Sequence, residues 1–285
     1  MLTQANLTSF VTYNPIALPV ETRLAEAVQT LAQTGIHHWP VVNAERQLVG
    51  ILSERDIVRV LTQQMRTPVA VGDSAPAQTD DLSVADTMSS VVEFVTLDES
   101  PRQVLTKLLE HTLDWLPVVQ DEMVVGVTTM ADFLREFSYG QIGLSKTQVS
   151  ELMVPAEIID SEMTLSEAWD ALTEHQSDCV GVVRGDLPLG VLSQRDVRLA
   201  MCRVAVADWL GDQPNVYEFE CSGPRTVLEL VSSAPTIRPG ARLQSAATLM
   251  LDHGREAIAV VNQANRMMGA VTEHEILQRM LNYLI

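Results

Sequence analysis

Four short segments of this chain place a hydroxyl side chain three residues before an acid. They read GILSERD at 50–56, GVTTMAD at 126–132, GVLSQRD at 190–196 and GAVTEHE at 269–275. A carboxylate can accept hydrogen bonds from both hydroxyls of a ribose, and a Ser or Thr hydroxyl can donate to a phosphate. The four pairs are Ser53 with Asp56, Thr129 with Asp132, Ser193 with Asp196 and Thr272 with Glu275. They are therefore candidate sites for a ribose phosphate.

The same spacing is also a helix-capping signal. The hydroxyl accepts from a backbone N–H of the first turn and the acid reaches back, which explains all four copies at about 1 kcal/mol each. We expect the strand before each copy to end at its glycine, leaving the first helical N–H groups free for an anion. Glu275 should cap as well as an Asp, but its longer side chain would misplace a ribose clamp. The fourth copy is thus the weakest candidate site.

The elements around each copy repeat in the same order, so the chain is an array of one unit. Apolar strands lie upstream at 39–42, 116–119, 180–183 and 258–261, at hairpin distance from the glycine. Amphipathic helices precede them, beginning near Thr22, Ser100, Thr164 and Ala241, and the first carries Leu24, Val28 and Leu31 on one face. Short extended pieces at 15–19, 94–97, 158–160 and 236–239 come before the helices. With a helix after each copy, the sequence predicts an α/β (α+β) fold of four β-α-β-β-α repeats.

Composition narrows the function classes. A net charge of −18 makes nucleic acid and anionic membrane surfaces poor partners. We expect no membrane insertion and no secretory signal, and the three cysteines, an odd number without CxxC spacing, favour free buried thiols in the cytoplasm. Metal-ligand spacing, a nucleophile elbow and a phosphate-binding Walker loop are absent from the sequence, so we do not expect an enzyme.

Two connections between the repeats stand out. Residues 63–81 contain Gly72 and Pro76 and are typical of a loop. Residues 203–230 carry Trp209, Tyr217 and Phe219. These aromatic residues either cover the core of their own module or form a partner-binding element.

The recurring features resemble tandem CBS domains, the family named after cystathionine beta-synthase. Each repeat has the amphipathic helix, the h-P-V-V strand and the G-h-h-[ST]-x-x-D ending, although Gly181 and Ala259 replace the proline in the last two repeats. The resemblance implies CBS repeats at 1–62, 82–140, 145–203 and 226–285. It also implies that they pair, with pseudo-two-fold symmetry, into Bateman modules at 1–140 and 141–285.

The resemblance further implies clefts for AMP, ADP, ATP or S-adenosylmethionine. In such clefts the Asp holds the ribose, the Ser or Thr binds ribose or phosphate, and residues before the h-P-V-V strand reach the phosphates. The implied ligand-binding residues are Ser53 and Asp56, Thr129 and Asp132, Ser193 and Asp196, and, less well matched, Thr272 with Glu275. We expect Arg55 and Arg195 to add phosphate contacts, unless they are solvated first-turn arginines.

The residues before the h-P-V-V strand separate the four repeats. The first repeat has His37 and His38, as in nucleotide-binding members such as the gamma subunit of AMP-activated protein kinase, whereas the others have Asp114, Asp178 and Glu256. A carboxylate would repel a phosphate. We therefore expect Ser53, Asp56 and the histidines to form the first phosphate site, unless the histidines are simply an exposed pair. The clefts of repeats 2 and 3 should suit adenosine, a cationic sulfonium ligand or a nucleotide with bound Mg²⁺.

The resulting hypothesis is a regulatory sensor of an adenine nucleotide that acts in trans on an unidentified partner protein. The alternatives are a structural adaptor or scaffold with vestigial clefts, and a sensor of S-adenosylmethionine or a cyclic dinucleotide. The two modules could close into one disc within the chain, or two chains could form a homodimer.

Overall fold

The protein is described by a computed structural model, which covers residues 7–34, 36–66, 82–110, 113–139, 146–174, 177–201, 226–231 and 234–284. Gly72, Pro76, Trp209, Tyr217 and Phe219, which marked the two predicted connections, lie outside these residues. None of the helices in the described ranges is long and apolar enough to cross a membrane.

The first two repeats follow the predicted order. The first contains β2 (Leu18–Pro19), α1 (Leu24–Thr34), β3 (His38–Val42), β4 (Leu48–Ser53) and α2 (Glu54–Arg66). The second contains α3 (Val84–Thr87), β5 (Val95–Thr96), α4 (Pro101–Glu110), β6 (Trp115–Gln120), β7 (Met123–Thr129) and α5 (Met130–Tyr139). In each, a short parallel strand and an antiparallel hairpin form the sheet. The apolar stripe Leu24, Val28 and Leu31 is buried, as its spacing predicts.

The last two repeats have the same order. The third contains η3 (Val149–Glu151), β8 (Glu157–Asp160), α6 (Leu165–Glu174), β9 (Cys179–Arg184) and β10 (Leu187–Ser193), and residues 194–201 are helical. The fourth contains α8 (Val227–Val231), β11 (Thr236–Ile237), α9 (Leu243–His253), β12 (Ala257–Val261), β13 (Met267–Thr272) and α10 (Glu273–Leu281). The predicted α/β fold of four β-α-β-β-α repeats is confirmed.

The prediction that each strand ends at its glycine is wrong. Strands β4, β7, β10 and β13 run through the glycine and end at the hydroxyl residue, at Ser53, Thr129, Ser193 and Thr272. The glycine pairs across the hairpin, for example Val41 with Gly50. The helix N-terminus therefore begins after the hydroxyl rather than at the glycine.

The glycines have a different role, because the beginning of each repeat packs on its partner repeat. Strand β1 (Thr12–Tyr13) follows η1 (Leu7–Phe10) and pairs with β7 of the second repeat, and a Cβ at Gly126 would meet Val11 and Thr12. Conversely, α3 joins the core of the first repeat, and a Cβ at Gly50 would meet Met88. The same exchange brings residues 149–154 onto the fourth repeat, and α8 together with Ala234 onto the third. Each pair is therefore held together by exchanged segments.

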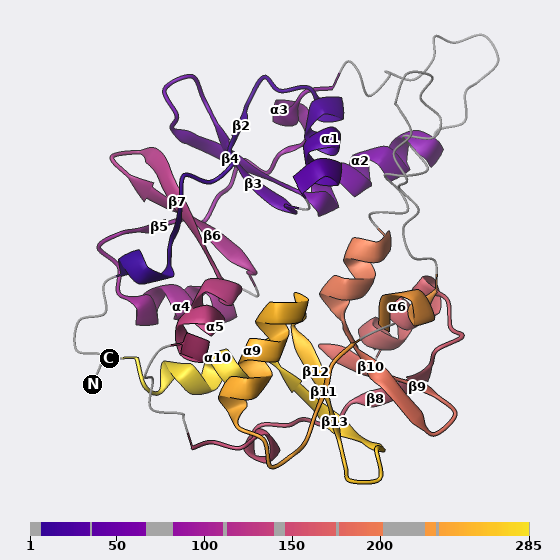
Figure 1. Ribbon diagram of the computed structural model, residues 1–285. Helices are drawn as coiled ribbons and strands as arrows, with labels where there is room; N and C mark the ends of the chain where they lie inside the picture. The colour runs from indigo at the N-terminus through magenta and orange to yellow at the C-terminus, as the bar shows by residue number, and fades with distance from the viewer. Residues whose placement is uncertain are drawn as a thin grey trace, which may run out of the picture.

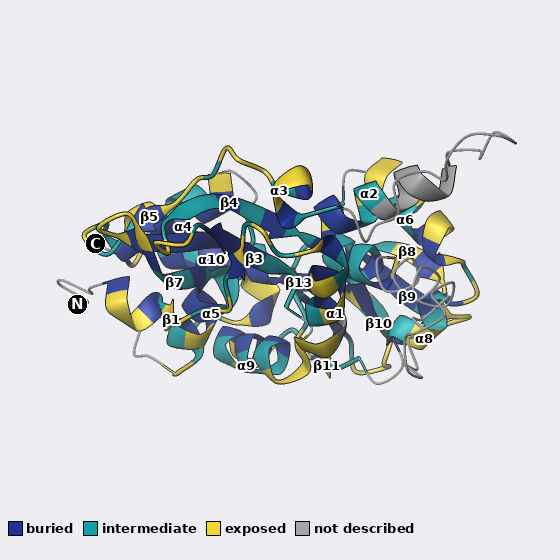
Figure 2. Cartoon of the chain, turned by 90° about the horizontal axis from the view of Figure 1, so that it is seen from above, coloured by how far each residue is buried: buried dark blue, intermediate teal, exposed yellow. Residues whose placement is uncertain are grey.

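The two pairs pack against each other through repeats 2 and 4. Helix α5 contacts α9 and α10, and the largest apolar core runs through both repeats. The Ser138 and Thr248 hydroxyls are hydrogen-bonded at 2.7 Å across this contact. Figure 1 shows the four repeats around a common centre. Seen from above, they form a shallow layer with buried residues in its middle (Figure 2). One chain thus brings both pairs into a single disc.

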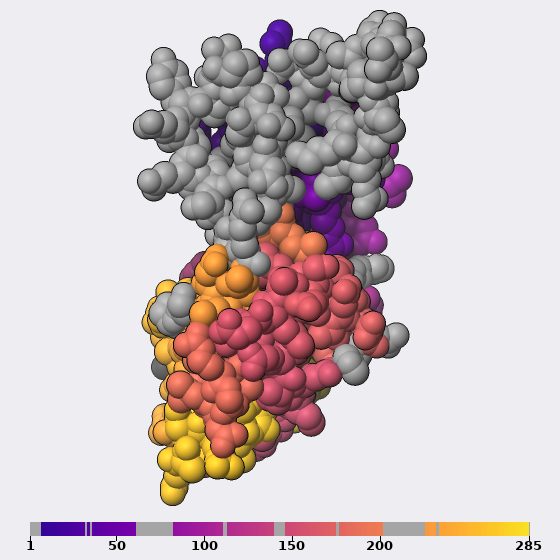
Figure 3. Space-filling model, turned by 90° about the vertical axis from the view of Figure 1, so that its right-hand side faces the viewer, coloured from indigo at the N-terminus to yellow at the C-terminus, as the bar shows by residue number. Residues whose placement is uncertain are grey.

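Within the second pair, the sheets of repeats 3 and 4 meet along an apolar seam. Its members are Cys179, Val191, Ala257, Ala259 and Ala270. The two repeats form one continuous surface in the space-filling view (Figure 3). Burial raises the pKa of the Cys179 thiol to about 12, in agreement with the predicted free, buried cysteine. Cys202 and Cys221 lie outside the described residues.

Candidate functional site

The hydroxyl and the acid of the first three copies form reciprocal helix caps. Asp132 accepts from the Thr129 backbone N–H at 3.0 Å and from the Thr129 hydroxyl at 2.7 Å, and its own N–H donates to that hydroxyl at 3.1 Å. Ser53 with Asp56 and Ser193 with Asp196 repeat this geometry. These caps occupy one carboxylate oxygen, Oδ2, and turn the other toward the rest of the site.

The fourth copy caps only in part, which corrects the expectation that Glu275 caps as well as Asp. The Thr272 hydroxyl accepts from the Glu275 N–H at 3.2 Å, but within the described residues the Glu275 carboxylate makes no return bond to Thr272. A Glu at this spacing can close the cap, because Glu167 accepts from both the backbone N–H and the hydroxyl of Thr164 at 2.8 Å, so the open cap is a feature of this position. This copy therefore lacks the oriented carboxylate on which a ribose clamp depends.

In each of the three complete copies, the other oxygen of the Asp carboxylate, Oδ1, forms an ion pair with an arginine. Asp56 pairs with Arg59 at 3.2 Å and Asp132 with Arg135 at 2.6 Å, and both arginines lie on the same helix as their partner and are more than half exposed. Asp196 instead meets Arg255 of the fourth repeat at 3.2 Å, and that side chain is only 19% exposed. Arg255 also donates to the Leu230 carbonyl at 2.6 Å. The Asp196 carboxylate is therefore held by a cross-repeat arginine, whereas the other two face solvent-exposed arginines.

A cavity of about 480 Å³ lies at the second copy, between the first two repeats. Thr129 and Asp132 line it, and the Thr12 hydroxyl donates to Asp132 Oδ1 at 3.3 Å. Asn14 and Ile16 belong to the same wall. The cavity is therefore lined by the capped carboxylate of Asp132, by residues of the exchanged N-terminal segment and by apolar side chains. Its volume is typical of small-molecule sites.

His37 and His38 line this cavity too, so the structure groups the predicted residues differently from the sequence. The sequence predicts that the histidines serve the site of Ser53 and Asp56, but the structure brings them beside Thr129 and Asp132. Ser53 and Asp56 do not line the described cavities. The physical reason is the packing of the pair, which places the beginning of β3 from one repeat against the cap of the other.

His38 is a neutral member of this wall. Burial, with the positive charge of Arg195 next, lowers its pKa to about 3. Its ring lies 5.5 Å from that of Trp115 and its Nε2 lies 3.9 Å from Glu54, a contact between a neutral imidazole and a carboxylate. The expectation that the histidine pair is merely exposed does not hold for His38. At neutral pH His38 offers hydrogen bonds and a ring face rather than a charge.

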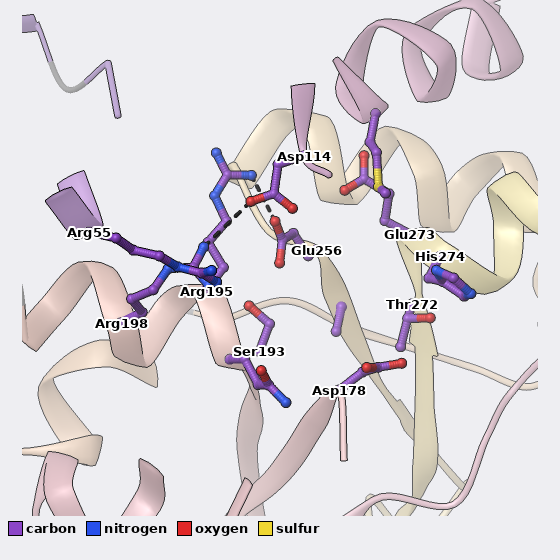
Figure 4. Close-up of a pocket in the computed structure, with 13 residues that line it drawn as sticks. Arg55, Asp114, Asp178, Ser193, Arg195, Arg198, Glu256, Thr272, Glu273 and His274 are labelled. Carbon is purple, nitrogen blue, oxygen red and sulfur yellow. Dashed lines mark hydrogen bonds and ion pairs between the residues drawn. The ribbon is translucent and has the colours of Figure 1, made fainter. Parts of the chain in front are cut away.

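A second cavity of about 340 Å³ lies where all four repeats meet. The predicted residues Arg55, Ser193, Arg195 and Thr272 line it together with the acids before the h-P-V-V strands, which are Asp114, Asp178 and Glu256. Arg195 and Arg198 extend toward Asp114 and Glu256 (Figure 4). The acidic residues expected to repel phosphate are thus gathered at one place and faced by arginines.

Three ion pairs at this centre join different repeats. Arg195 pairs with Glu256 at 2.7 Å, and Arg198 pairs with Glu54 at 3.2 Å and with Asp114 at 3.4 Å. Burial raises the pKa of Glu54 although Arg198 opposes the shift. Glu54 is 1% exposed, so its carboxylate depends on this arginine. Arg198 therefore links the third repeat to the first two.

Glu273 is the acid that sequence reasoning missed. It follows Thr272 directly and lines both cavities. Burial, reinforced by the negative charge of Glu256, raises its pKa to about 8. The sequence contains one signal for this residue. An acid directly follows the hydroxyl residue in only two of the four copies, at Glu54 and at Glu273. Within the described residues, no group of three His, Cys, Asp or Glu side chains is arranged to hold a metal ion.

Comparison with known proteins agrees with the repeat structure. A family model described as CBS domain matches residues 7–63, 84–139, 149–203 and 227–282. The uncharacterized protein MJ1225 of Methanocaldococcus jannaschii is 24% identical over 196 residues, which is 65% of this chain and 65% of that protein. Inosine-5'-monophosphate dehydrogenase of Aquifex aeolicus is 28% identical over 170 residues, 59% of this chain but only 31% of the enzyme. The chain thus matches less than two thirds of the length of either relative.

Solved structures share the fold over nearly the whole chain. The crystal structure of MJ1225 has a TM-score of 0.70 and 17% identity, and covers 96% of this chain and 99% of that one. A conserved protein of Pyrococcus horikoshii has a TM-score of 0.60 and 15% identity, with the same coverage. At this level of identity the likeness concerns the four-repeat architecture.

Proposed function

The chain belongs to the CBS domain family, and from this premise we propose that it is a regulatory module that binds an adenosine-containing ligand between its first two repeats. AMP, ADP and ATP are the first candidates, and S-adenosylmethionine and a cyclic dinucleotide are the alternatives. The bound ligand would alter the activity of a separate partner protein. Any Mg²⁺ would arrive with the phosphates of ATP.

The cavity at Asp132 is the observation that carries this proposal. Asp132 is 6% exposed, and its Oδ1 is held by a hydroxyl and by an exposed arginine, both of which a ribose can replace. The apolar wall, which includes Ile16, Ile36 and Pro40, suits a purine ring. We propose that Asp132 accepts from the ribose hydroxyls and that Thr129 and the histidines line the path toward the phosphate.

The other predicted clamps rank lower. Arg255 already engages Asp196, so a ribose there would have to displace a largely buried arginine. Ser53 and Asp56 retain the capping geometry without a described cavity around it. We therefore propose Thr129 and Asp132 as the primary site in place of the first repeat.

Ligand-induced stabilisation tests the proposal. We would measure thermal unfolding with adenosine, AMP, ADP, ATP, S-adenosylmethionine and a cyclic dinucleotide, since a ligand at 100 times its Kd adds about 2.7 kcal/mol. Asp132→Asn should weaken binding about 10-fold or more, because a hydrogen bond to a charged group contributes about 1.5–3 kcal/mol. Asp56→Asn is the matched control, since it changes the same type of cap outside the cavity.

The possible results separate the candidate functions. Binding that Asp132→Asn weakens and Asp56→Asn leaves within about twofold supports the proposed site. Equal losses in both variants would mean that the clamp lies elsewhere or that the effect comes from capping. If none of the ligands shifts the unfolding temperature, the scaffold with vestigial clefts becomes the better description. Release of product from ATP by the pure protein would instead indicate an enzyme.

A further inference from the structure

Arg195 lies between the two cavities. It belongs to the helical residues 194–201 of the third repeat, yet it lines both the central cavity and the cavity of the first pair. Its Nη1 donates to Glu256 Oε1 at 2.7 Å, and the two side chains are 35% and 25% exposed. The second pair of repeats thus supplies a guanidinium to the wall of a site in the first pair.

The other charged groups of that wall have different partners. Asp132 is paired with Arg135, which lies one helical turn further along α5, and Asp114 is paired with Arg198. His38 is neutral because its burial lowers its pKa. Arg195 is therefore the cation that reaches this wall from the second pair of repeats, and a carboxylate of the fourth repeat holds it.

A phosphate is a stronger partner for this guanidinium than a carboxylate. It carries a charge of about −1.5 to −2 at neutral pH and offers three acceptor oxygens, which suits the planar fork of arginine. Adenosine lacks this group, so it can enter the cavity without disturbing the ion pair. The phosphate of AMP, in contrast, would compete with Glu256 for the guanidinium of Arg195.

Glu256 would resist this exchange. Burial raises the pKa of Glu256, and the charge of Arg195 opposes that shift. Without the arginine, the Glu256 carboxylate would remain in a partly buried place that also contains Asp114 and Glu273. Glu256 therefore acts as an internal anion that competes with the ligand.

We propose that Arg195 is the phosphate-contacting residue of the first-pair cavity and that Glu256 competes with the phosphate for it. Binding of a phosphorylated adenosine between repeats 1 and 2 would then release an ion pair that joins repeats 3 and 4. The inference rests on the proposed function of that cavity, and it adds the phosphate as the feature of the ligand that the second pair recognises.

Isothermal titration with AMP and with adenosine tests this inference on the full chain, and the affinity for AMP relative to adenosine is the quantity of interest. Arg195→Gln should reduce this ratio about 10-fold, because one charge-assisted contact to the phosphate is lost. Glu256→Gln should increase it several-fold by freeing the arginine. In the double variant the Glu256 effect should disappear, since the carboxylate acts through Arg195. Arg266→Gln, on an exposed hairpin, is the control for loss of one positive charge.

Two results would overturn the inference. One is an unchanged ratio in Arg195→Gln, and the other is a Glu256→Gln variant that favours adenosine over AMP. Both are distinct from failure of the proposed function, in which the wild-type chain binds neither ligand. Circular dichroism and the unfolding temperature of each variant establish whether a change in affinity comes from the site or from loss of the fold.

Discussion

Replacing Glu273 by Gln is expected to remove a pH-dependent loss of stability from this protein. Glu273 is 7% exposed, and its pKa lies at about 8 instead of the ordinary 4.5, because it is buried and lies near Glu256. Asp114 and Asp132 raise the pKa further, and Arg195 opposes the shift. The folded state therefore keeps a proton that the unfolded chain has already released above pH 4.5.

The sign and size of the effect follow from proton linkage. A carboxyl whose pKa is raised by folding stabilises the native state at low pH, and this contribution is lost as the pH rises toward 8. One pKa unit corresponds to about 1.36 kcal/mol, so a shift to about 8 predicts a loss of about 2.5 kcal/mol between pH 5.5 and 7.5. Gln reproduces the neutral acid and cannot ionise. The stability advantage of the variant over the wild type should therefore grow by about 2.5 kcal/mol between pH 5.5 and pH 7.5.

Urea unfolding of both proteins at several pH values measures this difference. The low pKa of His38 and the raised pKa of Glu54 also make stability depend on pH, but they are present in both proteins and largely cancel in the comparison. Glu275→Gln, two residues further along the same helix and outside the lining of both cavities, is the matched control for the loss of a carboxylate. Parallel profiles for the wild type and Glu273→Gln would refute the reasoning.

Two further predictions concern the packing between paired repeats. Gly269→Ala should destabilise the protein by about 1–3 kcal/mol in urea, because its Cβ would overlap a backbone carbonyl of the exchanged segment, whereas Gly240→Ala has open space and should change stability by less than about 0.5 kcal/mol. Similar losses at both glycines would contradict a close approach at Gly269. Arg255→Met should cost about 1–3 kcal/mol because it leaves Asp196 without its cross-repeat partner, whereas Arg59→Met, which breaks an exposed pair, should cost less than about 1 kcal/mol. The same unfolding measurement compares the two, and a larger loss from Arg59→Met would show that the cross-repeat pair contributes little.

Local patterns predicted most of the fold. The amphipathic stripe of α1, the hairpins and the capping pairs depend on residues only a few positions apart, and the structure has them in the predicted order. The sequence shows a glycine at a fixed position in each copy, but it does not show that the glycine allows the partner repeat to approach closely. Gly126 is close to Val11 and Thr12 from the beginning of another repeat, a contact that no local pattern encodes.

The sequence by itself determined that four similar units exist and that three of them carry a Ser or Thr with an Asp in capping geometry. Only the tertiary structure decided what each carboxylate faces. Asp132 opens into a cavity beside the histidines of the preceding repeat, Asp196 is held by Arg255, and Arg195 is paired with Glu256, which lies 61 residues away. These contacts arise from the exchange of segments within each pair and from the packing of the pairs into a disc. The reason is physical: a cap depends on one turn of helix, whereas the charge and volume of a cleft depend on side chains contributed by every repeat that meets there.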